Sequence, residues 1–182
     1  MQTKETMMRV KPFAITLDVG TSLANRTGSW RTLKPVYVDR LPPCNAKCPA
    51  GEQCQAWLFH AQSGNYENAW KQIIEDNPFP AVMGRVCYHT CQGACNRNGI
   101  DEPVGINAVE RFLGDYALEK DWQLPVPAAD TGKRILIVGA GPAGLSAAYQ
   151  LRRLGHAVHV VESAEAAGGM MRYGIPKYRL PR

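Results

Sequence analysis

The stretch KRILIVGAGPAGLSAAYQLRRLGHAVHVVES, residues 133–163, decides the fold of the second part of the chain. It begins with an apolar run typical of a buried strand, turns through small residues and continues with a helical pattern. A second apolar run then ends at Glu162. A strand, a glycine-rich turn, a helix and a second strand form a βαβ unit with parallel strands. Residues 133–182 are therefore predicted to begin a Rossmann-type α/β domain. Because that fold needs two βαβαβ halves, we expect it to be truncated here.

The turn fits the dinucleotide-binding fingerprint at each of its glycines. Gly139 would allow the tight turn, Gly141 would let a pyrophosphate approach the backbone, and Gly144 would let the helix pack on the strand. Glu162, 23 positions after Gly139, is placed to accept a hydrogen bond from a ribose hydroxyl. The candidate nucleotide-binding residues are those of the turn, this acid and a later glycine: Gly139, Gly141, Pro142, Ala143, Gly144, Glu162 and Gly169.

The sequence before this unit has the apolar spacing of α-helices. The helical segments are EQCQAWLFHAQSG (52–64), YENAWKQIIED (66–76) and INAVERFLGDYALEK (106–120). Pro78 and Pro80 predict that the stretch NPFPAVMGR, residues 77–85, is a loop that leads to Cys87, because proline cannot continue a helix.

Composition divides the chain into four parts. A partly basic arm precedes the helical region, and a linker rich in Pro and Ala separates that region from the βαβ unit. The expected organisation is an arm at 1–40, a helical domain at 41–124, a linker at 125–132 and the nucleotide-binding segment at 133–182.

The expected compartment decides how the six cysteines should be understood. The N-terminus, MQTKETMMRVKPFAITLDVG, has neither the apolar core of a secretory signal nor the Arg-rich, acid-poor composition of a transit peptide. No apolar run approaches the roughly 20 residues that cross a bilayer. A cytoplasmic protein without a membrane span is therefore expected. Its thiols should stay reduced, which favours metal binding or redox chemistry over disulfides.

Five of the six cysteines fall into two groups, CNAKC beginning at Cys44 and CYHTCQGAC beginning at Cys87. Two C-x-x-x-C pairs have a spacing that suits a tetrahedral zinc site. Four thiolates also hold a 4Fe-4S cluster, often with a proline after a ligand, as in Cys48-Pro49. Spacing alone leaves zinc and iron–sulfur open.

Charge and motif content exclude other functions. The formal net charge of +5 is modest, and no basic stripe with interleaved aromatic residues follows the chain, so nucleic-acid binding is not expected. The basic arm could contact a partner protein. No Ser-His-Asp set or carboxylate pair indicates a hydrolase.

Whole motifs resemble a known family. The segments that carry the resemblance are CNAKCPAGE, GRVCYHTCQGACNR, VGINAVERF, ILIVGAGPAGLSAAYQL and GGMMRYGIPKYRLP. Together they are similar to the small (beta) subunit of bacterial glutamate synthase and its relatives, which include the N-terminal part of dihydropyrimidine dehydrogenase. The stretch SWRTLKPVYVDRLPPCNAKCPAGE looks most like the NADH-linked iron–sulfur flavoproteins of the dissimilatory sulfite reductase system. The similarity covers nearly all of residues 30–182.

The resemblance implies an α-helical 4Fe-4S domain followed by the first βαβ unit of a Rossmann-type FAD-binding domain. A flavin that accepts a hydride can release electrons singly only to a nearby one-electron carrier, which favours iron–sulfur over zinc. Six cysteines are too few for two all-cysteine cubanes. Relatives of the glutamate synthase type carry two further cysteines upstream of the position of Cys44, and LKPVYVDRLPP has none. We therefore expect one cluster.

The family pattern assigns Cys48, Cys87 and Cys91 to that cluster. It leaves the fourth ligand open between Glu110 and Cys95. The candidate metal ligands are Cys44, Cys48, Cys87, Cys91, Cys95 and Glu110.

Some of these candidate ligands and two neighbouring residues have other interpretations. In the family pattern Cys44 and Cys95 would belong to a cluster that has lost its other ligands. Cys54 shares the apolar face of a helix and is expected to be a buried structural thiol. Asn107 is placed to cap the helix that follows it, and Glu110 to return a hydrogen bond to the Asn107 N–H, as in a capping box.

The resemblance implies the N-terminal part of an NAD(P)H-dependent oxidoreductase that passes electrons through FAD and a cluster to a partner oxidoreductase. Residues 1–182 alone are expected to be inactive. The alternatives are a zinc-stabilised interaction module attached to a dinucleotide-binding domain and a plain NAD-dependent dehydrogenase fragment. Metal content separates the first alternative from the iron–sulfur hypothesis.

Overall fold

The computed structural model describes residues 41–125 and 128–182. The predicted N-terminal arm and two residues of the predicted linker lie outside the described residues. In chain order the elements are α1 (Pro43–Lys47), α2 (Cys54–Gln62), α3 (Tyr66–Asp76), α4 (Pro80–Val86), α5 (Thr90–Gly93), the 3₁₀ turn η3 (Asn96–Gly99), α6 (Ile106–Glu119), β1 (Arg134–Val138), α7 (Pro142–Arg153), β2 (Ala157–Val161) and α8 (Met170–Tyr173). The predicted order, a helical unit followed by a βαβ unit, is confirmed.

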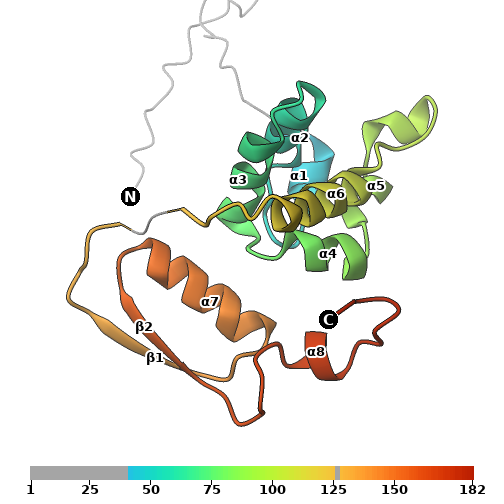
Figure 1. Ribbon diagram of the computed structural model, residues 1–182. Helices are drawn as coiled ribbons and strands as arrows, with labels where there is room; N and C mark the ends of the chain where they lie inside the picture. Colours follow the sequence, from blue (N-terminus) through green and yellow to red (C-terminus); the bar gives the residue numbers. More distant parts are fainter. Residues whose placement is uncertain (1–40, 126–127) are drawn as a thin grey trace, which may run out of the picture. The chain divides into compact units, whose positions relative to one another are not determined.

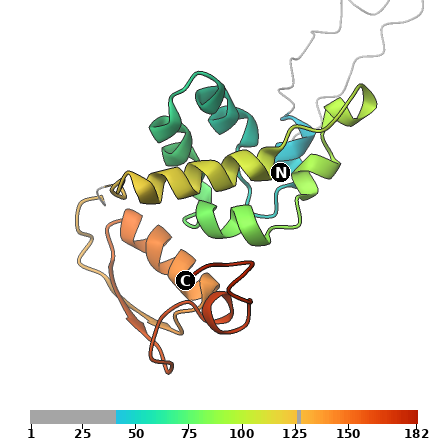
Figure 2. The ribbon, with the colours of Figure 1, turned by 45° about the vertical axis from the view of Figure 1, so that its right-hand side comes forward.

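The helical unit is organised around α6. The helices α2 and α3 form a pair on one side of α6, and α4 lies on its other side (Figures 1 and 2). Trp57, Ile73 and Leu113, from three different helices, are completely buried in one core. Burying a side chain of this size contributes about 1.5–3 kcal/mol. The predicted apolar faces of α2 and α3 therefore become the interior of the unit.

The prediction of a loop over residues 77–85 is wrong for most of that stretch. Residues Pro80–Val86 form α4. Pro80 occupies the first turn, where the missing N–H has no helical partner to lose and the fixed φ angle already suits a helix. The two prolines therefore mark the start of a helix, and Cys87 follows directly at its C-terminal end.

Two glycines bring α4 and α6 into backbone contact. A Cβ atom on Gly84 would lie 2.4 Å from the Arg111 Cα, and one on Gly114 would lie 2.2 Å from the Ala81 backbone nitrogen. Neither position has room for a side chain. Across the same contact the Arg85 guanidinium binds both carboxylate oxygens of Asp115, at 2.6 and 2.8 Å. The end of α4 is thus fixed against α6.

The predicted capping box at the start of α6 is wrong. The residue that precedes the helix is Gly105, and no side chain caps it. Asn107 lies inside the helix and donates its side-chain amide to the Met83 carbonyl oxygen at 3.2 Å. Its backbone N–H donates a hydrogen bond to the Gln92 side-chain oxygen at 3.1 Å. Tertiary contacts to α4 and α5 replace the local cap.

The βαβ unit forms as predicted. Strands β1 and β2 pair in parallel, with Arg134 opposite Ala157 and Val138 opposite Val161, and α7 connects them (Figure 1). The strand residues alternate between half-buried and exposed because α7 covers one face of the sheet. Leu136 and Val138 on the other face are mostly exposed.

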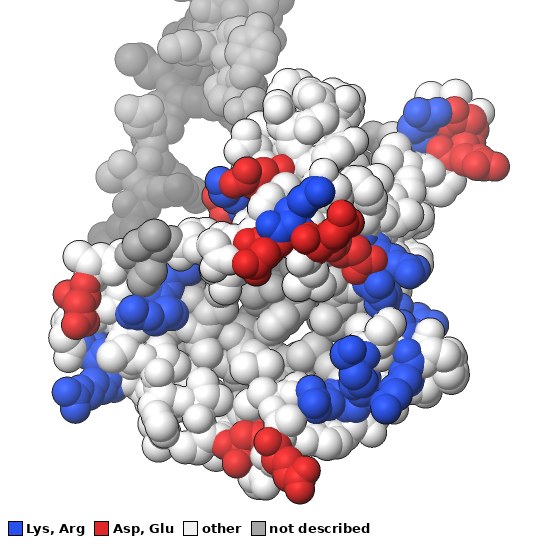
Figure 3. Space-filling view, in the orientation of Figure 1, with Lys and Arg blue, Asp and Glu red and all other residues white. Residues whose placement is uncertain are grey.

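The charged side chains on the face shown in Figure 3 form small separate groups of Lys and Arg and of Asp and Glu, with uncharged residues over most of the area. None of the helices in the part of the chain that the structure describes is both long and apolar enough to span a membrane.

Candidate functional site

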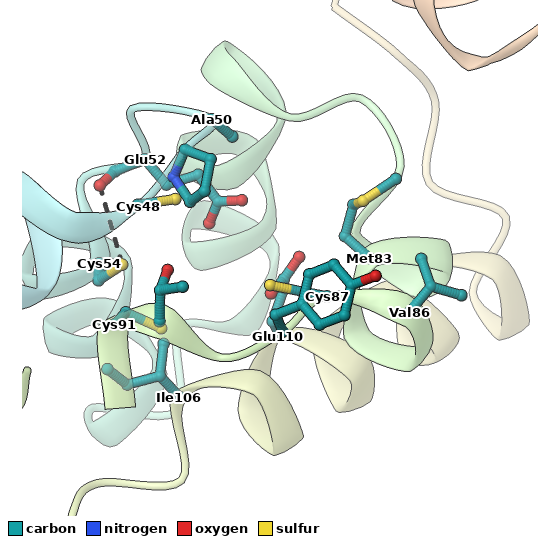
Figure 4. A pocket seen from close by; sticks show the side chains of 13 residues that line it. Cys48, Ala50, Glu52, Cys54, Met83, Val86, Cys87, Cys91, Ile106 and Glu110 are labelled. Atoms are coloured by element: carbon teal, nitrogen blue, oxygen red, sulfur yellow. Dashed lines mark hydrogen bonds between the residues drawn. The ribbon is translucent and has the colours of Figure 1, made fainter. Parts of the chain in front are cut away.

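The helical unit contains a cavity of about 280 Å³ that is lined by four thiols. Figure 4 shows Cys48, Cys54 and Cys91 on one side of it, with Cys87 and Glu110 on the other. The remaining lining residues are mainly apolar: Pro49, Ala50, Met83, Val86, Ile106, with Glu52, Tyr88 and Thr90. Segments far apart in the sequence therefore bring sulfur ligands together around one cavity.

Three short elements position the thiols. Cys48 follows α1, Cys54 is the first residue of α2, and Cys91 lies in α5. The Thr90 hydroxyl donates a hydrogen bond to the Lys47 carbonyl oxygen at 2.8 Å, which ties α5 to the end of α1. This bond keeps the adjacent residues Cys91 and Cys48 on the same wall of the cavity.

Cys87 reaches the cavity from the end of α4. The backbone N–H of His89 points at the Cys87 sulfur across 3.4 Å, a contact that stabilises a thiolate. The tight turn that makes this possible places His89 itself in the left-handed region, with a φ of 57°. The His89 side chain is exposed and does not line the cavity.

Two buried carboxyl groups share one amide at the cavity wall. The Asn77 side-chain nitrogen donates to Glu52 and to Glu110, each at 2.9 Å. Burial raises the pKa of Glu52 to about 7. Burial, followed by the nearby Glu52 charge, raises the pKa of Glu110 to about 9. In the metal-free protein at neutral pH, Glu110 is therefore a neutral acid.

The thiols on one wall affect one another's pKa values. The bond from Cys54 is the largest cause that lowers the pKa of Cys48 to about 6 and that of Cys91 to about 7. The same bonds raise the pKa of Cys54. Cys48 and Cys91 are thus the sulfurs best prepared to act as thiolates, the form that binds metal. Burial raises the pKa of Cys87.

The structure brings together four of the six predicted ligands: Cys48, Cys87, Cys91 and Glu110 all line the cavity. Cys44 and Cys95 do not line it. Burial raises the pKa of Cys44.

Two residues of this site have no functional role in the sequence prediction. Cys54 is buried, as expected, but it also lines the cavity and contacts two thiols. Asn77, which bridges the two acids, lies 25 residues from Glu52 and 33 from Glu110. No local pattern marks it. The only sequence signal for Cys54 is its place six residues after Cys48, in the same segment.

The arrangement of donors suits a cluster better than a single ion. Within residues 41–125 and 128–182, no three His, Cys, Asp or Glu side chains converge in the way that a single metal ion requires. A zinc ion would need its thiolates about 2.3 Å from one point. Three of the predicted thiol ligands and the carboxyl group of Glu110, around a largely apolar cavity, fit the four-ligand donor set of a 4Fe-4S cluster.

The glycine turn between β1 and α7 has the geometry that the fingerprint requires. Gly139 has a φ of 101°, which favours glycine. A Cβ atom on Gly144 would lie 2.0 Å from the Gly139 carbonyl oxygen, whereas one on Gly141 would meet nothing within 4 Å. Pro142 and Ala143 form the first turn of α7. The turn therefore closes tightly at Gly139 and Gly144 and leaves space beside Gly141 for a phosphate.

Two later residues close on this turn. Glu162 accepts hydrogen bonds from the Ala140 N–H at 2.6 Å and the Ala164 N–H at 2.9 Å. The bonds from Ala164 and then Ala140 lower the pKa of Glu162. A Cβ atom on Gly169 would lie 2.9 Å from the Gly141 Cα. Both residues thus lie beside the phosphate position, and ribose binding by Glu162 stays a prediction.

Each unit of the chain matches a known domain. Residues 38–122 match the family described as dihydropyrimidine dehydrogenase domain II, 4Fe-4S cluster. Residues 137–179 match the NAD(P)-binding Rossmann-like domain. The NADPH glutamate synthase small chain of Bacillus subtilis is 39% identical over 136 residues, which cover 74% of this chain and 28% of that one. The chain is similar to glutamate synthase small chains over about three quarters of its length.

Further relatives are similar over a like share of the chain. The NADH glutamate synthase of Schizosaccharomyces pombe is 43% identical over 136 residues, 74% of this chain and 6% of that protein. The beta subunit of the NADP-dependent formate dehydrogenase of Moorella thermoacetica is 37% identical over 163 residues, 77% of this chain and 23% of that one. The chain spans less than a third of each of these three relatives. The predicted 4Fe-4S domain and the predicted nucleotide-binding segment are confirmed by the two matched families.

Proposed function

We propose that the chain is the cluster-binding and nucleotide-binding part of an NAD(P)H-dependent oxidoreductase. Its electrons would pass through FAD and one 4Fe-4S cluster to a partner oxidoreductase, of the glutamate synthase type or of sulfur metabolism. The observation that carries the proposal is the cavity lined by thiols in the same chain as the glycine turn. When bound, FAD and the cluster would supply the conversion between hydride transfer and single-electron transfer.

The residues that would hold the cluster are Cys48, Cys87 and Cys91, with Glu110 in the fourth position. Glu110 stands on the same side of the cavity as Cys87. Cys95, the other candidate for the fourth position, does not line the cavity. The apolar side chains of Met83, Val86 and Ile106 would exclude water from the site, which influences a reduction potential.

The residues around the glycine turn would bind the pyrophosphate and ribose of FAD. The N-terminal end of α7 offers free N–H groups and the positive end of a helix dipole. Gly141 would let the pyrophosphate approach the backbone, and the carboxylate of Glu162 would accept a ribose hydroxyl. Gly169 would keep the space beside Gly141 open, because a side chain there would crowd the turn.

The relatives support a partner that receives the electrons. The Bacillus subtilis protein is named a small chain and the Moorella thermoacetica protein a beta subunit. A chain of this kind would work beside a larger subunit.

Metal, sulfide and flavin analysis of the full-length protein, purified without oxygen, tests the proposal. We expect about four irons and four labile sulfides per chain, bound flavin, and bleaching of the visible absorption when NADH or NADPH is added. Cys87→Ser should lose the iron because Cys87 lines the cavity. Cys95→Ser is the matched control and should keep it. Stoichiometric zinc without labile sulfide would instead establish the zinc-stabilised interaction module. About eight irons would show that a second ligand set exists.

A further inference from the structure

The side chain of Asn77 touches the fourth candidate ligand, Glu110, from behind. Asn77 directly follows α3, is 4% exposed and does not itself line the cavity. Its amide bonds Glu110 and Glu52, two acids that do line the cavity. Asn77 is therefore placed to act on a bound cluster only through another residue.

The backbone fixes which way the Asn77 amide points. Its side-chain oxygen accepts a hydrogen bond from the Phe79 N–H at 3.0 Å. A backbone N–H can only donate, so the amide atom that faces it is the oxygen and the nitrogen faces the acids. The residue before a proline is held in extended backbone, and Asn77, which precedes Pro78, has a φ of −122° and a ψ of 102°. The turn thus presents the amide nitrogen to the acids with little backbone freedom.

The two protons of the Asn77 nitrogen are both used. One is donated to Oε1 of Glu52 and one to Oε1 of Glu110, each at 2.9 Å. The bond to Glu52 keeps the amide from turning away from Glu110. Among the hydrogen bonds of the residues that the structure describes, Oε2 of Glu110 has none. Glu110 therefore has one oxygen held by Asn77 and one free to bind at the cavity.

We propose that Asn77 is a positioning residue for the fourth cluster ligand, because its amide holds one oxygen of Glu110 while the other oxygen meets the iron. This inference rests on the proposed function, in which Glu110 completes the ligand set. Carboxylates that bind metals are commonly oriented by such outer hydrogen bonds, and loss of the outer partner typically costs about 10–100-fold in metal affinity. Without the amide, the carboxyl group of Glu110 would rotate and its iron would be held weakly.

A structural role competes with this one. The bond to Phe79 shapes the turn that leads into α4, and α4 ends at Cys87. An asparagine that only shapes this turn would need its oxygen and not its nitrogen. The two roles therefore use different atoms of the same amide, and a variant that keeps only the oxygen separates them.

Variants of the full-length protein, purified without oxygen, make that separation. Asn77→Asp keeps an oxygen for the Phe79 N–H and removes the amide donor, whereas Asn77→Leu removes both. Glu110→Ala removes the ligand, alone and together with Asn77→Leu. Asn107→Leu is the matched control, because Asn107 is another buried asparagine of this unit, which bonds Met83 and neither acid.

The readout is the loss of one iron from the cluster. Ferricyanide takes one electron from the cluster, and a weakly held iron then leaves as Fe²⁺, so that the 4Fe-4S cluster becomes a 3Fe-4S cluster. Iron analysis counts the change, and EPR follows its rate. We expect the loss to be about 10-fold faster or more in Asn77→Asp and Asn77→Leu, and near the wild-type rate in Asn107→Leu. Asn77→Leu should add nothing to Glu110→Ala, because both act at the same iron.

Four results would overturn the inference. A wild-type rate in Asn77→Asp would leave Asn77 as the residue that shapes the turn. Equal acceleration in Asn107→Leu would assign the effect to loosening of the whole unit. Further acceleration in the double variant would show that Asn77 does not act through Glu110. A wild-type rate in Glu110→Ala would remove Glu110 from the ligand set. Wild-type protein without iron would instead overturn the proposed function itself, a result that the iron count shows before ferricyanide is added.

Discussion

The helical unit and the βαβ unit build their sites in different ways. The cavity takes its ligands from α1, α4, α5 and α6 and the residues that flank them, so it exists only when those elements have packed. The glycine turn and its first helical turn lie within six consecutive residues, 139–144, between β1 and α7. A site assembled by tertiary packing depends on contacts far from its ligands, whereas a site encoded in one segment depends mainly on its own backbone.

The largest effect should come from the helix contact that supports the cavity. Gly114→Ala would place a Cβ atom 2.2 Å from a backbone nitrogen of α4, so the two helices would have to separate. We expect a loss of about 3 kcal/mol in the free energy of unfolding, at the upper end for overpacking, and loss of iron. Chemical denaturation and iron analysis measure both. Gly99→Ala, at a position with nothing within 4 Å, should change neither. Equal iron content in the two variants would show that the cavity tolerates movement of α6.

The pH dependence of the metal-free protein should reveal the two buried acids. Their pKa values in the folded protein, about 7 for Glu52 and about 9 for Glu110, lie above the ordinary value of 4.5. An acid with a raised pKa stabilises the fold fully below pH 4.5, and this contribution is lost as the pH rises through its folded pKa. The contribution of these two acids to the stability should therefore fall as the pH rises from about 5 to about 9. Thermal unfolding at several pH values measures the slope, and Glu110→Gln should flatten it. An unchanged pH profile in Glu110→Gln would contradict the raised pKa of Glu110.

Two substitutions in the glycine turn should separate its folding from its binding. In Gly144→Ala the new methyl group would lie 2.0 Å from the Gly139 carbonyl oxygen, so we expect about 1–3 kcal/mol of destabilisation together with weaker nucleotide binding. In Gly141→Ala the methyl group meets nothing in the chain, and we expect nearly unchanged stability with weaker binding. Calorimetric titration with FAD and thermal unfolding of the full-length protein test this difference. Iron content should be the same in both variants, because the cavity lies in the other unit. Unchanged FAD affinity in Gly141→Ala would show that the pyrophosphate does not bind at this turn.

The smallest effect should come from the ion pair between α4 and α6. Arg85→Gln removes a two-bond pair with Asp115, whose side chain is 42% exposed, so we expect a loss of no more than about 1 kcal/mol. The difference from wild type in chemical denaturation should shrink at high salt. Arg111→Gln is the control, because the Arg111 nitrogen lies 3.7 Å from the same carboxylate, farther away than the two Arg85 nitrogens. A loss in Arg85→Gln as large as that in Gly114→Ala would mean that charge, and not close packing, holds the two helices.

The difference between a site built by tertiary packing and a site encoded in one segment also explains which features the sequence predicted. The βαβ unit follows from periodicity and glycine spacing because its contacts are local, and each glycine behaves as its place in the motif requires. The buried faces of α2 and α3 followed for the same reason. The prediction of a loop at Pro80 failed because a proline can also occupy the first turn of a helix. The prediction of a capping box failed because Asn107 donates its hydrogen bonds to Met83 and Gln92 instead.

The cavity could be predicted only in part. Residue type identified three of its thiols, and the family pattern added Glu110. The position of Cys54 between two ligands and the bridge made by Asn77 arise from how the short helices pack, and no spacing in the sequence encodes them.

The backbone contact between α4 and α6 also has a mechanical consequence. Cys87 ends α4 and Glu110 belongs to α6, and the two helices meet through Gly84 and Gly114 without intervening side chains. The span between these two groups is therefore set by main-chain atoms, which cannot change rotamer. A cluster held across such a span would keep nearly the same dimensions in both oxidation states. Its reorganisation energy would be small, and each electron would leave at little cost in nuclear rearrangement.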